Sequence, residues 1–356
     1  MDLIKIRLKD LKDFCDSEVY NQFKVKPISP LRTASYIHNP RAHGDDYVLY
    51  MLVENNELLA FRTIWADRVY DGDQAIRFGW YSGNWVAPHY RRQGWSKRLF
   101  QESYADWEKR VMFTNYAEAS KQLYLDSKTF QLLKERHGKR FYLFPDMHEI
   151  IKNKSIPSWI KKLAPALTVC CALLSGFKIF FYKGKLLQYT ELEQLDEGCM
   201  QLLAEKSTSS LYQRGPLEIA WIFQYPWITN KQMEHVEYPF SYSVTNFQIK
   251  IVKQEEQGNV SFFFIYTIIN KKMKILYYYG HQNDTKQLSN IILDIAVRNR
   301  ISYLTVLDRE LAAIVERQAS WFIFSKGITS NIYSSFQLHD VSSKKIFDGD
   351  GDNCFT

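Results

Sequence analysis

Apolar residues follow two kinds of spacing along the first half of the chain. Alternation of apolar and polar residues predicts strands, and recurrence every three to four positions predicts helices. Asn55 and Asn56 separate two apolar runs and accept the positive φ of a tight hairpin turn. The pattern predicts a strand at residues 1–7, strands at 46–54, 58–65 and 75–86, a helix from 96, a strand at 111–115, a helix from 119 to about 134 and a strand at 140–144.

The same order of elements recurs after residue 236. Asp308 is a suitable cap for a helix that ends at about 318. The predicted elements are strands at 242–252, 260–269 and 273–279, a helix over 288–296, a strand at 303–307, the helix after Asp308 and strands near Phe322 and Tyr333. We therefore expect the second half to repeat the fold of the first.

An apolar stretch, 163–177, lies between the two halves. Its fifteen residues separate Lys162 from Lys178, which is short of the roughly 20 that a membrane-spanning helix needs. We favour a buried or interdomain helix over an interfacial membrane helix with lysines at the headgroups. The predicted division is a domain at 1–155, an apolar helical junction at 156–235 and a second domain at 236–356.

Composition narrows the class of protein. The 356 residues exceed one typical core, and the hydrophobic fraction of 46% with 15% aromatic residues indicates a folded chain. The net charge is +7 without a long basic run, which argues against nucleic acid as the main partner. The five cysteines lack metal-ligand spacing and the N-terminus lacks the apolar core of a signal peptide, so we expect a cytoplasmic protein.

Residues 85–100 combine the end of an apolar strand, a proline, a basic turn with one glycine and an amphipathic helix. The first N–H groups of a helix have no intrahelical partners, so such a turn can bind an anion. Gly94 lets the backbone approach a ligand closely. Four basic side chains raise the local positive potential, which favours a diphosphate over a single carboxylate: Arg91, Arg92, Lys97 and Arg98.

This stretch resembles the acetyl-CoA-binding motif of the GNAT family of N-acyltransferases, V-x-P-x-[YF]-R-x-x-G-x-[GA] followed by a leucine-rich helix. The matching residues are Val86, Pro88, Tyr90, Arg91 and Gly94, and Ser96 departs from the motif. The resemblance implies an α/β fold of two tandem GNAT-like domains, each a mostly antiparallel mixed sheet flanked by helices. It also implies that acetyl-CoA, or another acyl-CoA, is bound as co-substrate by Trp85, Val86, Arg91, Arg92, Gln93, Gly94, Trp95, Ser96 and Lys97.

A second motif of the family resembles residues 115–124, in which small residues precede Leu123 and Tyr124, with Phe130 further on. Thr129 stands where the family has a glycine. The resemblance implies that Tyr124 is the general acid that protonates the departing CoA thiolate, because a donor near sulfur stabilises developing charge. Packing of Tyr124 in the core is an equally open interpretation.

A base near the third strand is expected to deprotonate the amine, yet residues 78–85 contain no acid. A water relay through Tyr81 or Asn84 is one option. The other candidates are acids more typical of solvated turns and helix ends: Asp67, Asp71, Asp73 and Glu118.

No metal is expected. The tail at 348–353 resembles a calcium loop only superficially, because the acid that completes such a loop would fall beyond Thr356. A polar turn is the favoured interpretation there. The eight histidines form no close pair with metal-ligand spacing.

The second half lacks the basic turn, because residues 280–286 contain one lysine, an acid and no V-x-P-x-x-R-x-x-G. We expect one cofactor site, with the second half shaping the acceptor site. The leading hypothesis is an acyl-CoA-dependent N-acyltransferase, in particular an acetyltransferase, that acts on a small-molecule amine. The alternatives are a non-catalytic CoA-binding scaffold protein and a FemAB-like aminoacyl transferase, which residues 214–221 loosely suggest. The sequence indicates neither the acceptor nor the oligomeric state.

Overall fold

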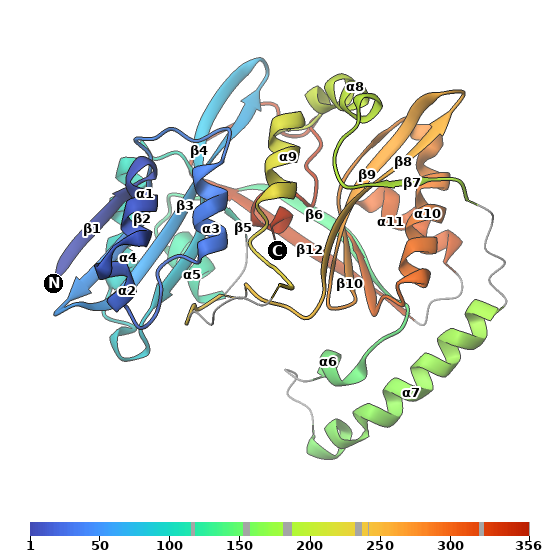
Figure 1. The fold of residues 1–356 in the computed structure, drawn as a ribbon, viewed down its shortest axis with the longest axis horizontal. Coiled ribbons are helices and arrows are strands. Elements are labelled where there is room, and N and C mark those ends of the chain that lie inside the picture. Colours follow the sequence, from blue (N-terminus) through green and yellow to red (C-terminus); the bar gives the residue numbers. More distant parts are fainter. Residues whose placement is uncertain are drawn as a thin grey trace. The chain divides into compact units, whose positions relative to one another are not determined.

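The structure is a computed structural model that describes residues 1–114, 118–151, 157–180, 187–231, 237–240, 242–319 and 324–355. The chain forms two compact units (Figure 1). Unit 1 comprises Met1–Glu135, Ser207–Val244 and Ser330–Thr356, and unit 2 comprises Arg136–Lys206 and Thr245–Thr329.

Unit 1 contains a mixed sheet in which only β4 and β5 are parallel among the described pairs. The predicted hairpin is confirmed, with Asn55 and Asn56 at φ values of 49° and 63°. The strands lie in the order β1 (Asp2–Arg7), β2 (Tyr47–Glu54), β3 (Glu57–Asp71), β4 (Gln74–Val86), β5 (Val111–Thr114) and the end of β12 (Phe324–Ser334).

Helix α4 connects β4 to β5 and covers one face of this sheet, where Leu99 and Phe100 pack with Ile64 and Tyr81. Because side chains alternate along a strand, Trp65 and Trp80 point to the other face, where both are fully buried. The helices of unit 1 are α1 (Leu11–Asp16), α2 (Glu18–Gln22), α3 (Pro30–Ile37), α4 (Trp95–Asp106), α5 (Glu118–Asp126) and α9 (Pro216–Gln224).

The predicted helix from 119 to about 134 is too long. Helix α5 ends at Asp126, and β6 starts at Gln131. The Ser127 hydroxyl donates to the Tyr124 carbonyl oxygen at 2.5 Å, and Lys128 has a φ of 56°. A hydroxyl that takes a helix carbonyl and a left-handed residue after it both end a helix.

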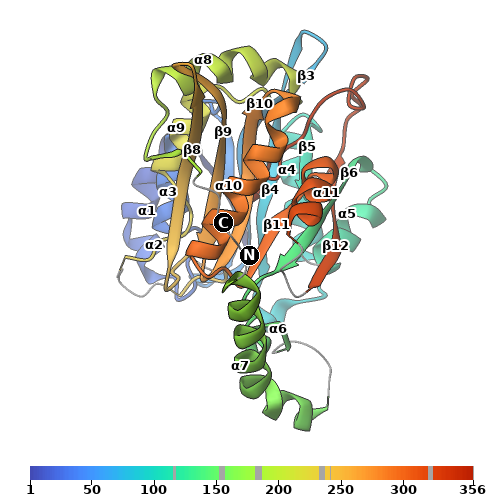
Figure 2. The same ribbon diagram turned by 90° about the vertical axis from the view of Figure 1, so that its right-hand side faces the viewer.

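Unit 2 contains a second mixed sheet, in which β10 and β11 are parallel. Its strands lie in the order β7 (Thr190–Leu192), β8 (Phe247–Glu256), β9 (Asn259–Ile269), β10 (Lys272–Gly280), β11 (Tyr303–Val306) and β6 (Gln131–Tyr142). Its helices are α6 (Met147–Ile151), α7 (Ser158–Phe180), α8 (Glu197–Lys206), α10 (Thr285–Arg298) and α11 (Arg309–Gln318). Figure 2 shows α10 and α11 in front of these strands. The Asp308 cap is confirmed, since its carboxylate accepts the Leu311 N–H at 2.8 Å; Phe322 lies outside the described residues.

The two sheets have the same plan, an antiparallel meander followed by a helical crossover to a parallel strand and a final antiparallel strand. The final strands are exchanged: β12, from the end of the chain, pairs with β5, and β6 pairs with β11. This exchange moves the unit boundary to residue 135, in place of the predicted 155, and returns 207–244 to unit 1. The predicted α/β fold with mostly antiparallel mixed sheets flanked by helices is confirmed.

The prediction of a buried helix at 163–177 is wrong. Helix α7 runs for 23 residues, straight through Pro165, and only 11% of its Ser158–Phe177 segment is buried. That segment is long enough and apolar enough to cross a membrane, judged by length and composition. Counting only the residues between Lys162 and Lys178 therefore underestimated the apolar length of the helix.

Candidate active site

The turn between β4 and α4 leaves the start of the helix open. A short 3-10 helix, Pro88–Tyr90, follows β4, and α4 begins after Gly94, which provides no side-chain cap. Gly94 has a φ of 88°, and a Cβ built there would meet no atom within 4 Å. The first N–H groups of α4 need acceptors from outside the helix, so the space over Gly94 suits an anion.

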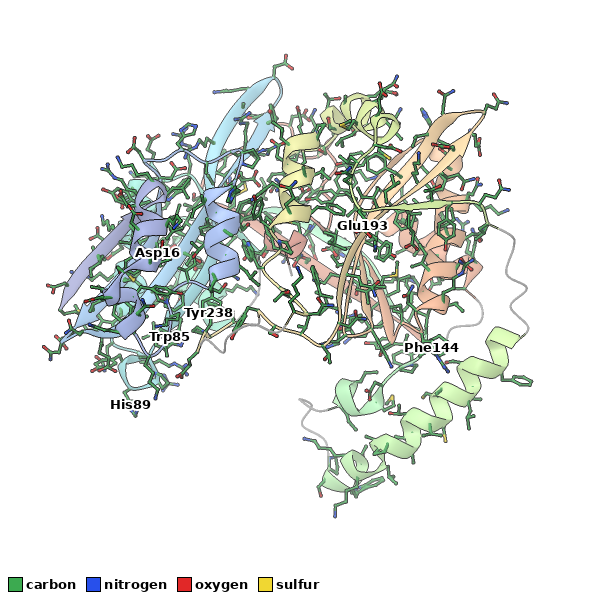
Figure 3. All side chains as sticks on the ribbon, viewed as in Figure 1. Asp16, Trp85, His89, Phe144, Glu193 and Tyr238 are labelled. Carbon is green, nitrogen blue, oxygen red and sulfur yellow. The ribbon has the colours of Figure 1, made fainter. Side chains whose placement is uncertain are left out.

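Three side-chain hydrogen bonds brace this turn. Arg91 Nε donates to the Val86 carbonyl oxygen, and Gln93 Nε2 donates to the His89 carbonyl oxygen, both at 3.2 Å. Trp95 Nε1 donates to Gln93 Oε1, also at 3.2 Å. The turn is therefore ordered by its own side chains, and Figure 3 labels His89 within it.

The predicted cofactor-binding residues differ in exposure. Arg91, Arg92, Gln93, Gly94 and Lys97 are exposed, whereas the other four are partly buried: Trp85, Val86, Trp95 and Ser96. The structure thus presents the basic part of the motif to solvent.

Two of the partly buried residues are engaged in packing. Trp85, labelled in Figure 3, stacks on Phe61 with ring centroids 5.6 Å apart. Ser96 Oγ donates to Asn84 Oδ1 at 3.0 Å, which ties the first turn of α4 to β4. The serine that departs from the family motif therefore has a structural partner of its own.

Strands β4 and β5 pair with each other over a short distance only. Their described pairing covers only Gly79 with Val111 and Trp80 with Met112, although β4 continues to Val86. Directly afterwards, the register between β3 and β4 shifts, because Ile64 pairs with Tyr81 and Thr63 with Gly83. Ser82 is the extra residue of this β-bulge.

Tyr124 on α5 is buried, and Arg62 Nη1 donates to its hydroxyl oxygen at 2.7 Å. Because arginine is the donor in this bond, the Tyr124 proton is not used by it. In the described part of the chain, no acceptor takes that proton. The predicted general acid is thus held in place with its own proton available.

Arg62 on β3 is the residue that sequence reasoning missed. Its side chain is fully buried, its guanidinium lies 4.5 Å from the Tyr81 ring centroid, and its Nη2 lies 3.3 Å from Asn84 Oδ1. Among the described residues, its Nε has no hydrogen-bond partner and no carboxylate bonds to the guanidinium. An uncompensated buried charge is costly, so it is typical of a functional position. An arginine inside the otherwise apolar run of β3 was the only sequence signal.

A carboxylate also reaches the β-bulge from the end of the chain. Asp352 Oδ2 accepts from Ser82 Oγ at 2.8 Å, and its Oδ1 accepts from Trp65 Nε1 at 2.7 Å. Arg32 Nη1 donates to Ser82 Oγ at 2.7 Å, which directs the serine proton toward Asp352. The polar turn expected at 348–353 is a turn in the structure, but Asp348, Asp350 and Asp352 are all buried in it.

Two of the four acids considered as bases, Asp67 and Asp71, have other partners. Asp67 is fully buried between Arg41 and Arg214, at 2.9 and 2.8 Å. Burial raises its pKa, but the two arginines and a hydrogen bond from Trp80 outweigh this and hold the pKa below its usual value. Asp71 is hydrogen-bonded to residues 339 and 340. Asp73 is exposed, and the side chain of Glu118 lies outside the described residues, as do residues 115–117.

The corresponding turn of unit 2 is built differently. Asp284 stands at the N-cap position of α10 without a side-chain bond to the helix, and its carboxylate accepts the His281 backbone N–H at 3.1 Å. A carboxylate at this position repels a phosphate group, and it already occupies a backbone N–H group of the turn.

No protein-family model matches the chain, and no curated protein matches it. Solved structures do match the chain. The chain is similar to an N-myristoyltransferase from Saccharomyces cerevisiae with bound myristoyl-CoA, at 12% identity and a TM-score of 0.51, over 94% of this chain and 83% of that one. It is also similar to a protein of unknown function from Enterococcus faecalis, described as a probable N-acyltransferase, at 10% identity and a TM-score of 0.50, over 93% of this chain and 72% of that one. The chain thus has the GNAT-type acyltransferase fold that the sequence motif implied.

Proposed function

We propose that the protein is an acyl-CoA-dependent N-acyltransferase, with acetyl-CoA as the favoured donor and a small-molecule amine as the acceptor. The observation that carries the proposal is the start of α4 at the exposed Gly94, which has no side-chain cap and, among the described residues, no atom within 4 Å of its Cβ position. Backbone N–H groups there would bind the CoA diphosphate. The thioester would lie near the bulge at Ser82.

The residues around the bulge suit direct transfer. The acceptor nitrogen attacks the thioester carbonyl carbon, so that a C–N bond forms and the C–S bond breaks. Tyr124 donates its proton to the departing thiolate, and the Arg62 cation beside it stabilises the negative charge. The two positioned groups thus act on the leaving side of the reaction.

The attacking side needs a base for the amine proton. Asp352 meets β4 at Ser82, two residues beyond the last β4–β5 pair. We assign it this role, with the proton passing directly or through the Ser82 hydroxyl. Asp352→Asn should lower kcat/KM most at neutral pH, and an unchanged pH profile would exclude the assignment.

Aromatic packing favours a short acyl chain. Tyr81, Phe100, Phe113 and Phe130 surround Tyr124 with ring centroids 4.5–5.9 Å away. Rings at these distances fill the volume behind the proposed acid. A myristoyl chain, as bound by the yeast enzyme, would need these rings to move.

The test is calorimetry with acetyl-CoA and myristoyl-CoA, followed by an amine screen that follows free thiol release. We expect acetyl-CoA to bind and a subset of amines to release thiol. Binding without turnover would favour the scaffold protein, and absence of binding to either CoA would overturn the proposal. Tighter binding of myristoyl-CoA would refute only the short-chain part.

A further inference from the structure

One side of helix α7 packs against the rest of unit 2. Ala164 and Ser175 are buried, and the Met147 backbone N–H donates to Thr168 Oγ1 at 2.9 Å. The Ser175 hydroxyl donates to the Leu143 carbonyl oxygen. Figures 1 and 2 show α6 and α7 beyond the ends of the unit 2 strands. These contacts hold the helix along its length.

The opposite side of α7 is a continuous apolar surface. Its large side chains recur at helical spacing, and the exposed fraction reaches 68% at Leu173 and 67% at Phe177. The members of this apolar face are Trp159, Leu163, Leu167, Val169, Leu173, Leu174 and Phe177. Lys161 and Lys162 are exposed at its N-terminal end, where their side chains can extend to a polar boundary. Contiguous exposure of this kind marks an interaction surface.

The anchoring contacts decide between two membrane arrangements. A spanning helix would carry Ala164, Thr168 and Ser175 into the hydrocarbon, together with the part of unit 2 that they contact. The cationic side chains near these contacts cannot enter that layer without a large cost in free energy. The geometry instead suits a helix that lies in the plane of the interface with its apolar face toward the acyl chains.

A basic cavity of about 540 Å³ adjoins α7, whose Thr168 and Ala172 form part of its wall. Phe144, labelled in Figure 3, also lines it. Among the described residues that line the cavity, one is acidic, Asp146, and five are cationic: Arg140, Lys271, Lys272, Arg300 and Lys326.

Aromatic rings in the cavity wall contact two of its cationic side chains. The Arg140 guanidinium lies 4.4 Å from the Tyr303 ring centroid, and Arg300 lies 5.6 Å from that of Phe144. Arg140 Nε is buried, and no described residue forms a hydrogen bond with it. A basic cavity beside an interfacial helix matches the phosphate of an anionic lipid, and its volume accommodates more than one phosphate group.

We propose that unit 2 binds the surface of an anionic membrane, with the apolar face of α7 among the acyl chains and a phospholipid headgroup phosphate in the basic cavity. The inference does not depend on the proposed function, since none of these residues belongs to the turn at Gly94 or to the Tyr124 site.

The experiment is vesicle flotation of the full chain with phosphatidylcholine alone and with phosphatidylcholine mixed with phosphatidylglycerol. We expect binding to the mixed vesicles and weaker binding to phosphatidylcholine. Leu173→Asp should lower the binding to mixed vesicles by about tenfold, because it places a charge on the apolar face. Leu217→Asp, at a leucine on α9 that is 73% exposed, is the matched control and should bind like the parent.

The cavity is tested with Lys271→Glu combined with Lys326→Glu. This double variant should lose the preference for anionic vesicles but keep the weaker binding to phosphatidylcholine, whereas Lys286→Glu, at an exposed lysine on α10, should not. Thermal melting of each variant checks that the fold is retained. Parent binding to neither vesicle, or unchanged binding of Leu173→Asp, would overturn the proposal.

Two further outcomes separate other occupants. Calorimetry with glycerol 3-phosphate tests whether the cavity binds a soluble anion. If the parent binds glycerol 3-phosphate saturably and no cavity variant loses flotation with anionic vesicles, the lipid headgroup is excluded as the occupant. Light scattering detects self-association, and a dimer that Leu173→Asp converts to a monomer, without vesicle binding by the parent, would assign the apolar face of α7 to a second copy.

Discussion

Replacement of Gly94 by valine separates backbone strain from ligand binding. Gly94 has a φ of 88°, where an L-residue costs about 1–2 kcal/mol. Its Cβ would meet no atom of the described residues within 4 Å, so the first side-chain atom adds no steric clash in the free protein. Gly94→Val should therefore lower the free energy of unfolding by only that strain.

A bound diphosphate changes this balance. The valine side chain would project into the space that the phosphate oxygens need in order to accept the first N–H groups of α4. Loss of a single hydrogen bond to a charged group costs about 1.5–3 kcal/mol. We expect the Kd for acetyl-CoA to rise about 10- to 100-fold.

The chain contains a matched control. Gly258, between β8 and β9, has a φ of 83° and likewise no atom within 4 Å of its Cβ. Gly258→Val should lose similar stability in urea unfolding but bind acetyl-CoA like the parent in calorimetry. The reasoning would be refuted if Gly94→Val bound acetyl-CoA as tightly as Gly258→Val does.

Three other predictions follow from the site and its surroundings. Tyr124→Phe removes the available proton but keeps the ring, so turnover should fall about 100-fold with little change in CoA affinity; equal turnover in a chemistry-limited assay would return Tyr124 to the core. Calorimetry should give one CoA per chain, because Asp284 occupies the corresponding turn of unit 2, and two equivalent sites would contradict this. Asp67 has a lowered pKa in the folded state, so its carboxylate stabilises the fold above about pH 4 and this stabilisation is lost as pH falls through the folded pKa. Asp67→Asn should lower the free energy of unfolding by about 3–5 kcal/mol at neutral pH, and by less in acid; a difference independent of pH would exclude the ion pairs as its cause.

The sequence by itself determined the features that depend on neighbouring residues. The Asn55–Asn56 turn, the Asp308 cap and the left-handed glycine before α4 follow from local backbone preferences, which a few residues fix without help from the rest of the chain. The alternation of apolar residues likewise located most strands. The α/β fold class and the glycine turn before α4 could therefore be predicted.

Only the tertiary structure shows which segments distant in the sequence pair with or contact one another. Exchange of β6 and β12 is invisible in the sequence, because a strand shows the same alternation whichever sheet it joins. Asp352 meets Ser82 across 270 positions, and Arg62 meets Tyr124 across 62, so neither pair has a local signature. Hydropathy showed that α7 is apolar, but whether an apolar helix is buried or exposed depends on what packs against it.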